Sequence, residues 1–131
     1  MMLSNFLRTV LKLDAASCLG MAALVVPGAA MLAAPFGIDP AFLRGAALSL
    51  VPIGLFILWL GTRREAPTAF VYLVIIGNVG WAAASLLTAV ELPGITSLGS
   101  AAVAAQGLAV LGLAILEWRG IKQSDRQAAA A

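Results

Sequence analysis

Residues 66–90 read APTAFVYLVIIGNVGWAAASLLTAV and contain no charged side chain in 25 positions. A helix needs about 20 apolar residues to cross the roughly 30 Å hydrocarbon core of a bilayer. Two more uncharged stretches of similar length occur at residues 15–38 and 92–116. A fourth, residues 45–61, is long enough if its helix starts at residue 41 and the intervening arginine snorkels toward the headgroups. The chain is therefore predicted to contain four membrane-spanning helices.

The links between these stretches are short, which limits how the helices can be arranged. They centre on Asp39-Pro40, on residues 62–65 and on Glu91. Helices joined by such short links run antiparallel to their neighbours. We predict an all-α fold, a membrane-embedded up-down-up-down four-helix bundle that forms one transmembrane domain over residues 1–131. The helices are expected at residues 13–38, 41–61, 66–90 and 92–118.

The two ends of the chain have patterns of their own. Apolar side chains recur at helical spacing near the start, which favours a short interfacial helix over residues 3–11. The end, residues 122–131, is polar and then rich in alanine, and we expect a mobile tail. Residues 15–38 also fit a secretory signal peptide, but the apolar run is too long and Pro27 interrupts it. We therefore expect a retained helix.

The basic residues indicate the orientation of the bundle. With antiparallel helices, all Lys and Arg residues except Arg44 fall on the side that carries both chain ends. Cytoplasmic loops of membrane proteins are enriched in Lys and Arg. Both termini are therefore predicted to be cytoplasmic. The residues on that side are Arg8, Lys12, Arg63, Arg64, Arg119, Lys122 and Arg126.

The composition excludes several classes of protein. Hydrophobic residues make up 62% of the chain and charged residues 11%, whereas soluble domains are about 25% charged. A net charge of +2 does not suggest a nucleic-acid surface. Cys18 is the single cysteine and there is no histidine, which removes a disulfide within the chain, the commonest metal ligand and the usual general base. We expect no enzyme, no metal, no cofactor and no nucleic-acid partner.

Polar side chains within the apolar stretches are the first candidates for function. Asn78 and Gln106 each lie a little over ten residues into their helices from opposite sides, so both are predicted to reach mid-depth and to hydrogen-bond directly. Such a pair could fasten the helices, which we favour, or line a solute path. Trp81 and Ser85 share the face of Asn78. Trp81 could be a packing side chain or one wall of a small cavity.

Two acidic residues lie at the predicted cytoplasmic boundary. Asp14 opens the first helix and Glu117 closes the fourth. They could join a ring of paired boundary charges, which we favour, or act as protonatable carboxylates at the mouth of a transport path.

The fourth stretch also carries small residues at every fourth position, a pattern that lets helix backbones touch within one bundle or between two protomers. They are Ser97, Ala101, Ala105 and Ala109.

The chain resembles a widespread group of small, uncharacterised bacterial four-helix integral membrane proteins. The matching features, spread over residues 8–122, are Leu13-Asp14-Ala15, Leu43-Arg44-Gly45, Gly77-Asn78 with Trp81 and Ser85, and Leu116-Glu117 with Gly120. The resemblance implies a bacterial inner membrane and makes Asp14, Asn78, Trp81 and Glu117 the first residues to test. In length and helix number the chain also resembles small multidrug-resistance exporters. That family carries a carboxylate well inside its first helix, whereas Asp14 is expected at the helix entrance.

Three functions are consistent with these observations. The leading hypothesis is a non-enzymatic accessory or structural component of the membrane, which contacts other membrane subunits or a second copy of itself. The alternative is a small proton-coupled or ion-conducting transporter that uses Asp14 and Glu117, with Asn78 and Gln106 lining its path. The third is binding of a lipid or quinone between helices beside Trp81.

Overall fold

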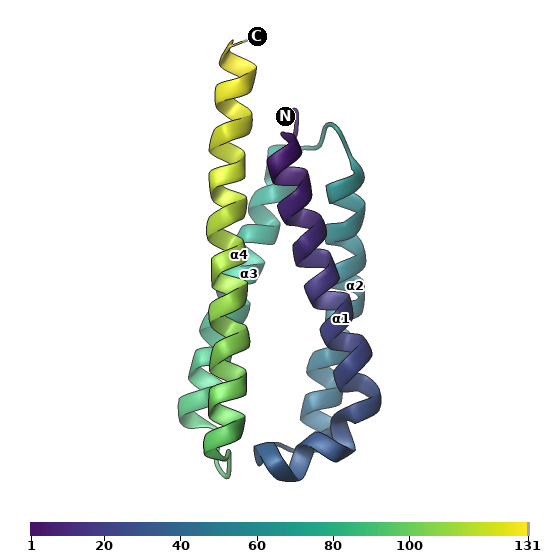
Figure 1. The fold of residues 1–131 in the computed structure, drawn as a ribbon, viewed down its shortest axis with the longest axis vertical. Helices are drawn as coiled ribbons and strands as arrows, with labels where there is room; N and C mark the ends of the chain where they lie inside the picture. The colour runs from purple at the N-terminus through teal and green to yellow at the C-terminus, as the bar shows by residue number, and fades with distance from the viewer. Residues whose placement is uncertain (131) are drawn as a thin grey trace.

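The computed structural model describes residues 1–130, and 87% of the chain is helical. Consecutive helices run in opposite directions, and both chain ends lie at the same end of the molecule (Figure 1). Each helix is long and apolar enough to cross a membrane. The predicted all-α bundle of four helices is confirmed. The helices are α1 (Asn5–Phe36), α2 (Pro40–Thr62), α3 (Thr68–Glu91) and α4 (Ser97–Ala130).

The bundle consists of two helical hairpins. α1 packs along α2 and α3 packs along α4, while the hairpins join mainly where α1 meets α4. Glycines permit the close approaches. A Cβ added to Gly54 would lie 2.9 Å from Leu19, and one added to Gly107 would lie 2.9 Å from Cβ of Ser85. α2 and α3 scarcely touch. The bundle therefore has one loosely closed seam, between α2 and α3.

The first helix begins earlier than predicted. Ser4 caps it, with Oγ accepting a hydrogen bond from N of Leu7 over 3.1 Å, so residues 3–11 do not form a separate interfacial helix. Leu7 and Leu11 are fully buried. Leu7 packs on Gly120, and Leu11 packs on Gly61. The apolar spacing near the start of the sequence is therefore the buried face of α1 and not a membrane-surface face.

The last helix also continues further than predicted. Residues 122–130, expected to be a mobile tail, are the final turns of α4, and Ala131 lies outside the described residues. Ser124 is buried. Its Oγ accepts a hydrogen bond from N of Ser4 and donates one to O of Gly120. Contact with the start of α1 therefore supports a segment whose composition alone suggested disorder.

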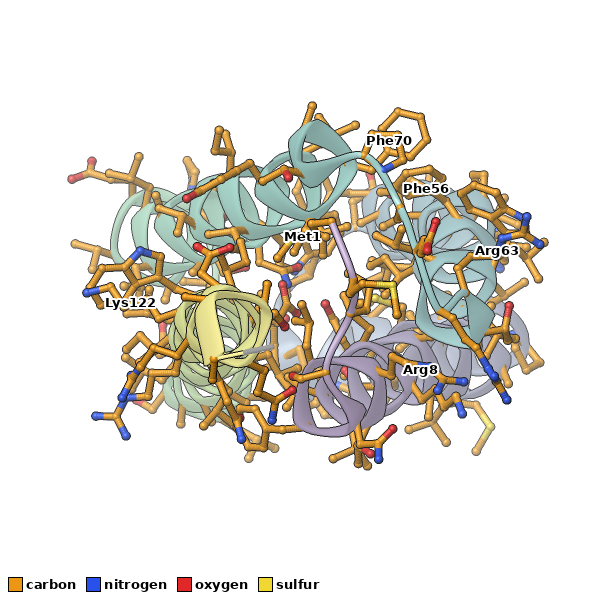
Figure 2. All side chains as sticks on the ribbon, turned by 90° about the horizontal axis from the view of Figure 1, so that it is seen from above. Met1, Arg8, Phe56, Arg63, Phe70 and Lys122 are labelled. Carbon is orange, nitrogen blue, oxygen red and sulfur yellow. The ribbon has the colours of Figure 1, made fainter. Side chains whose placement is uncertain are left out.

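A short N-terminal segment covers the end of the bundle where both termini lie. Figure 2, which looks down on this end, shows the chain crossing from Met1 to the start of α1. Met2 forms an antiparallel bridge with Glu65. N of Leu3 donates to O of Arg64 over 2.8 Å, and N of Ala66 donates to O of Met1 over 3.1 Å. This segment ties the α2–α3 loop to α1.

At the opposite end, α1 leans toward the start of α4 (Figure 1). N of Thr96 donates to O of Phe36 over 3.0 Å, and its hydroxyl donates to O of Pro35 over 2.7 Å. Gly37 ends α1 in a left-handed conformation with φ of 67°, which glycine adopts without steric cost. The two hairpins are thereby joined at both ends.

Candidate functional site

Three polar side chains from three helices meet inside the bundle. Nδ2 of Asn78, on α3, donates to Oδ2 of Asp14 on α1 over 2.6 Å and to Oε1 of Glu117 on α4 over 3.1 Å. The exposed fractions are 1% for Asp14, 6% for Asn78 and 0% for Glu117. We call these three residues the carboxyl–amide cluster. Its contacts join the α1–α2 hairpin to the α3–α4 hairpin.

The cluster lies deep in the helices and not at their boundary. Asn78 follows Thr68 by ten residues, about 15 Å along α3 and close to its middle. Asp14 and Glu117 lie at that level because α1 starts nine residues before Asp14 and α4 continues to Ala130. The expectation that both acids belong to a ring of boundary charges is therefore wrong. It rested on helix ends taken from the apolar stretches, whereas both helices extend into polar sequence.

The cluster has two carboxyl groups but only one amide donor. Oε2 of Glu117 is buried and has no hydrogen-bond partner within residues 1–130. The Cys18 thiol, one turn after Asp14, donates to Oδ1 of Asp14 over 3.7 Å. Buried polar atoms are nearly always paired, so this oxygen is an exception. A proton on one of the two carboxyl groups would account for it, because a protonated carboxyl group is also a donor.

Gln106 belongs to a second network. Its Oε1 accepts from the indole nitrogen of Trp81 over 3.1 Å, and its Nε2 donates to Oγ of Ser85 over 2.6 Å and to O of Val103 over 3.0 Å. The predicted bond between Gln106 and Asn78 does not form. Gln106 precedes Glu117 by eleven residues, about 16 Å along α4, so it cannot reach the level of the cluster.

A cavity of about 480 Å³ lies between the hairpins, and side chains of all four helices line it. Its walls are mainly aliphatic and aromatic, with Leu50 and Phe56 on α2 and Val74 on α3. Asn78, Trp81 and Gln106 contribute polar atoms. Trp81 is thus both a hydrogen-bonded packing residue and a wall of the cavity, which the sequence left as alternatives.

The cavity reaches the outside along the seam between α2 and α3. Among its lining residues, Pro52 and Ile53 on α2 and Leu73 and Gly77 on α3 are exposed. A Cβ built on Gly77 meets no atom within 4 Å, so this position faces open space. The opening therefore lies along the apolar middle of the two helices.

An aromatic cluster bridges the seam nearer the chain termini. Phe56 and Trp59 on α2 meet Phe70 on α3, with ring centroids separated by 5.8 Å for the Phe56–Phe70 pair and 6.2 Å for Trp59–Phe70. Figure 2 shows Phe56 and Phe70 close together at the edge of the bundle. Because Phe56 also lines the cavity, this cluster borders the opening.

The small-residue ladder on α4 does not mediate packing within the chain. All four of its residues are exposed, and Ala109 also lines the cavity. Glycines elsewhere on α4 make the close contacts: Gly99 with α1, Gly107 with α3 and Gly120 with α1. The ladder is Ser97, Ala101, Ala105 and Ala109.

Sequence reasoning missed two features of this site. Cys18 lies one helical turn after Asp14 and so on the same face, a spacing that could have placed it beside the acid. The contribution of α2 has no such signal in the sequence. Leu50, Pro52 and Phe56 line the cavity, but by residue type they cannot be distinguished from residues that face lipid.

Within residues 1–130 no group of three or more His, Cys, Asp or Glu side chains could hold a metal ion. Comparison of the chain with protein-family models, curated proteins and solved structures finds no match. The functional argument therefore rests on the cavity, the carboxyl–amide cluster and the network around Gln106.

Proposed function

We propose that this protein is an integral membrane protein that binds an apolar small molecule, a lipid or a quinone, between its helices. Four helices of sufficient length and apolarity support a membrane location. Large apolar side chains also cover the outside of the bundle, for example Leu24 and Ile76, each 67% exposed. Continuous exposed apolar surface on this scale is unfavourable in water and suits contact with lipid.

The cavity is the observation that carries the proposal. Packed protein interiors contain few voids larger than a water molecule, so a space of about 480 Å³ needs a reason. Small-molecule sites have volumes of about 300–1,000 Å³, mainly apolar walls and a few convergent polar groups. This cavity has all three properties, since only Asn78, Trp81, Gln106 and a few small polar side chains interrupt its apolar lining.

The position of the opening favours a ligand that arrives from the membrane. The seam between α2 and α3 opens among exposed apolar residues, Ile53 and Leu73. In a bilayer, such an opening would face hydrocarbon and admit molecules already dissolved there. A hydrophilic solute would have to lose its hydration before reaching this opening, which is costly.

The remaining expectations complete the proposal. The basic residues gather toward the end with both termini and the α2–α3 loop (Figure 1), which supports cytoplasmic termini in a bacterial inner membrane. The protein binds and does not catalyse. The exposed ladder on α4 offers a surface for a second copy of the chain.

Binding can be tested with the fluorescence of Trp81. In a Trp59→Phe/Trp118→Phe variant, Trp81 is the single indole, and 1-bromododecane is a contact quencher with no polar group. We expect saturable quenching in detergent micelles. Gly77→Phe fills the cavity and should abolish the saturable part, whereas Gly80→Phe should not, because Gly80 also has open space but lies outside the cavity. Equal, unsaturated quenching in all variants would contradict binding.

A second candidate is proton-coupled transport, favoured by the carboxyl–amide cluster. One proton held between the two carboxyl groups would remove a negative charge and turn the unpaired oxygen of Glu117 into a donor. Release of that proton could then accompany movement of a ligand past Asn78, which borders the cavity. In liposomes that contain the protein and an internal pH dye, addition of a ligand of the cavity should be followed by acidification of the interior. Glu117→Gln should stop this acidification. Proton movement that Glu117→Gln leaves unchanged would exclude the mechanism.

A further inference from the structure

We infer that the molecule bound in the cavity is an uncharged apolar compound with a hydroxyl group, and that this hydroxyl donates a hydrogen bond to Oδ1 of Asn78. This inference rests on the proposed binding function and specifies the chemistry of its ligand. Three observations support it: the orientation of Asn78, the occupation of the other polar groups, and the position of the acids.

The two carboxyl groups fix the orientation of the Asn78 amide. Both accept hydrogen bonds from Nδ2, at 2.6 Å from Asp14 and 3.1 Å from Glu117. A reversed amide would place its carbonyl oxygen against two other acceptors, which is repulsive unless both are protonated. Nδ2 has two hydrogens, and the two acids use both. The carbonyl oxygen must therefore point away from the acids.

That carbonyl oxygen is available to a ligand. The hydrogen bonds of the Asn78 side chain within residues 1–130 all come from Nδ2. Asn78 also lines the cavity, in which aliphatic and aromatic side chains predominate. An acceptor facing such a space without water or a donor loses the free energy of a hydrogen bond. A ligand that supplies a donor recovers it.

The larger polar groups of the cavity wall are already occupied. Oε1 of Gln106 accepts from Trp81, and Nε2 of Gln106 donates to Ser85 and Val103. The Cys18 thiol donates to Asp14. The hydroxyl of Ser17 also borders the cavity, but a hydroxyl both donates and accepts and so selects neither kind of ligand. Selectivity for a donor therefore comes from Asn78.

The position of the acids favours a neutral donor over a cationic one. Asp14 and Glu117 lie behind Asn78 and are not among the residues that line the cavity. A protonated amine in the cavity would thus face a neutral carbonyl and apolar walls without a counterion in contact, and burial of such a charge is costly. A hydroquinone or a long-chain alcohol fits, whereas an oxidised quinone has acceptors only.

The test compares two probes in which the hydroxyl hydrogen is present or is replaced by a methyl group. In the single-Trp81 protein, 12-bromododecan-1-ol and its methyl ether carry the same chain and the same quenching bromine. Quenching in Gly77→Phe supplies the baseline for unspecific partition. We expect the alcohol to bind about tenfold to a hundredfold more tightly than the ether, the range that one unpaired buried acceptor accounts for.

Variants assign the preference to Asn78. Asn78→Leu should equalise the affinities for the two probes. If Asn78→Leu alone does not fold, the same change combined with Asp14→Leu and Glu117→Met gives a variant in which no buried carboxyl group has lost its partner. Ser17→Ala should keep the preference.

Equal affinity for alcohol and ether in the parent protein would overturn the inference while leaving the binding function intact. A preference that survives loss of Asn78 would also overturn it. Absence of saturable quenching by either probe and by 1-bromododecane would refute both proposals.

Discussion

Replacing Asn78 by leucine should destabilise this bundle more than any other single loss of a polar side chain. Leucine has nearly the shape of asparagine but no donor, so the change removes both bonds of Nδ2, 2.6 Å to Asp14 and 3.1 Å to Glu117, without opening a large cavity. The two carboxyl groups would remain buried, and one oxygen of Glu117 already has no partner within residues 1–130. The variant therefore isolates the value of the shared amide.

The size of the loss depends on which of two effects dominates. Hydrogen bonds between membrane helices average only about 0.6 kcal/mol, because the unfolded state in the membrane also finds partners. Bonds to charged groups contribute about 1.5–3 kcal/mol, and removing one partner of a buried ionic group costs about 3–5 kcal/mol. Asn78 serves two acids that have no alternative amide, so the second effect should prevail. We expect a loss of about 3 kcal/mol.

Unfolding in mixed micelles titrated with sodium dodecyl sulfate, followed by circular dichroism at 222 nm, measures this loss. Gln106→Leu is the matched control because its partners, Trp81, Ser85 and Val103, are neutral, and it should cost about 1 kcal/mol. Adding Asp14→Leu and Glu117→Met to Asn78→Leu should restore most of the stability, since apolar replacement of a whole buried ionic group is often neutral. The reasoning is refuted if Asn78→Leu costs no more than Gln106→Leu, or if the triple variant is less stable than the single one.

Two further predictions concern packing and the end of the bundle. Gly107→Val should destabilise the protein by about 1–3 kcal/mol, because a Cβ there lies 2.9 Å from Cβ of Ser85. Gly112→Val should be nearly neutral, since its Cβ meets nothing within 4 Å. Equal melting temperatures of the two variants would contradict this. Ser124→Ala removes the acceptor of the Ser4 amide, so hydrogen exchange of that amide should quicken several-fold while the free energy of unfolding changes by about 1 kcal/mol or less. Unchanged exchange would show that the contact does not hold the N-terminal segment.

The sequence predicted the number and order of the helices because bilayer thickness and short loops leave few alternatives. Their ends were harder to predict. Leu7 looked like part of the apolar face of a surface helix, and only its contact with Gly120 on α4 shows that this face is buried. Hydropathy records composition, whereas a helix end depends on contacts such as the one between Ser4 and Ser124.

The site was predicted in its members but not in its connections. Asp14, Asn78 and Glu117 were singled out, yet Asn78 was paired with Gln106 because depth was counted from the ends of the apolar stretches. An error of a few residues at each helix end moves a side chain by several ångströms along the axis, enough to exchange one partner for another. A small cavity beside Trp81 was one of two alternatives, but its size and its opening could not be predicted, since they depend on how far α2 stands from α3.

The most direct test of the account is to identify what the protein retains when it is extracted from its own membrane. Native mass spectrometry of the full chain, followed by chemical analysis of the released species, would show whether a molecule accompanies it. We predict a neutral apolar compound with a hydroxyl group at fixed stoichiometry, absent from Gly77→Phe and retained by Gly80→Phe. A protein without a bound molecule, or with the same lipids at the same level in both variants, would contradict the claim that the cavity is a binding site.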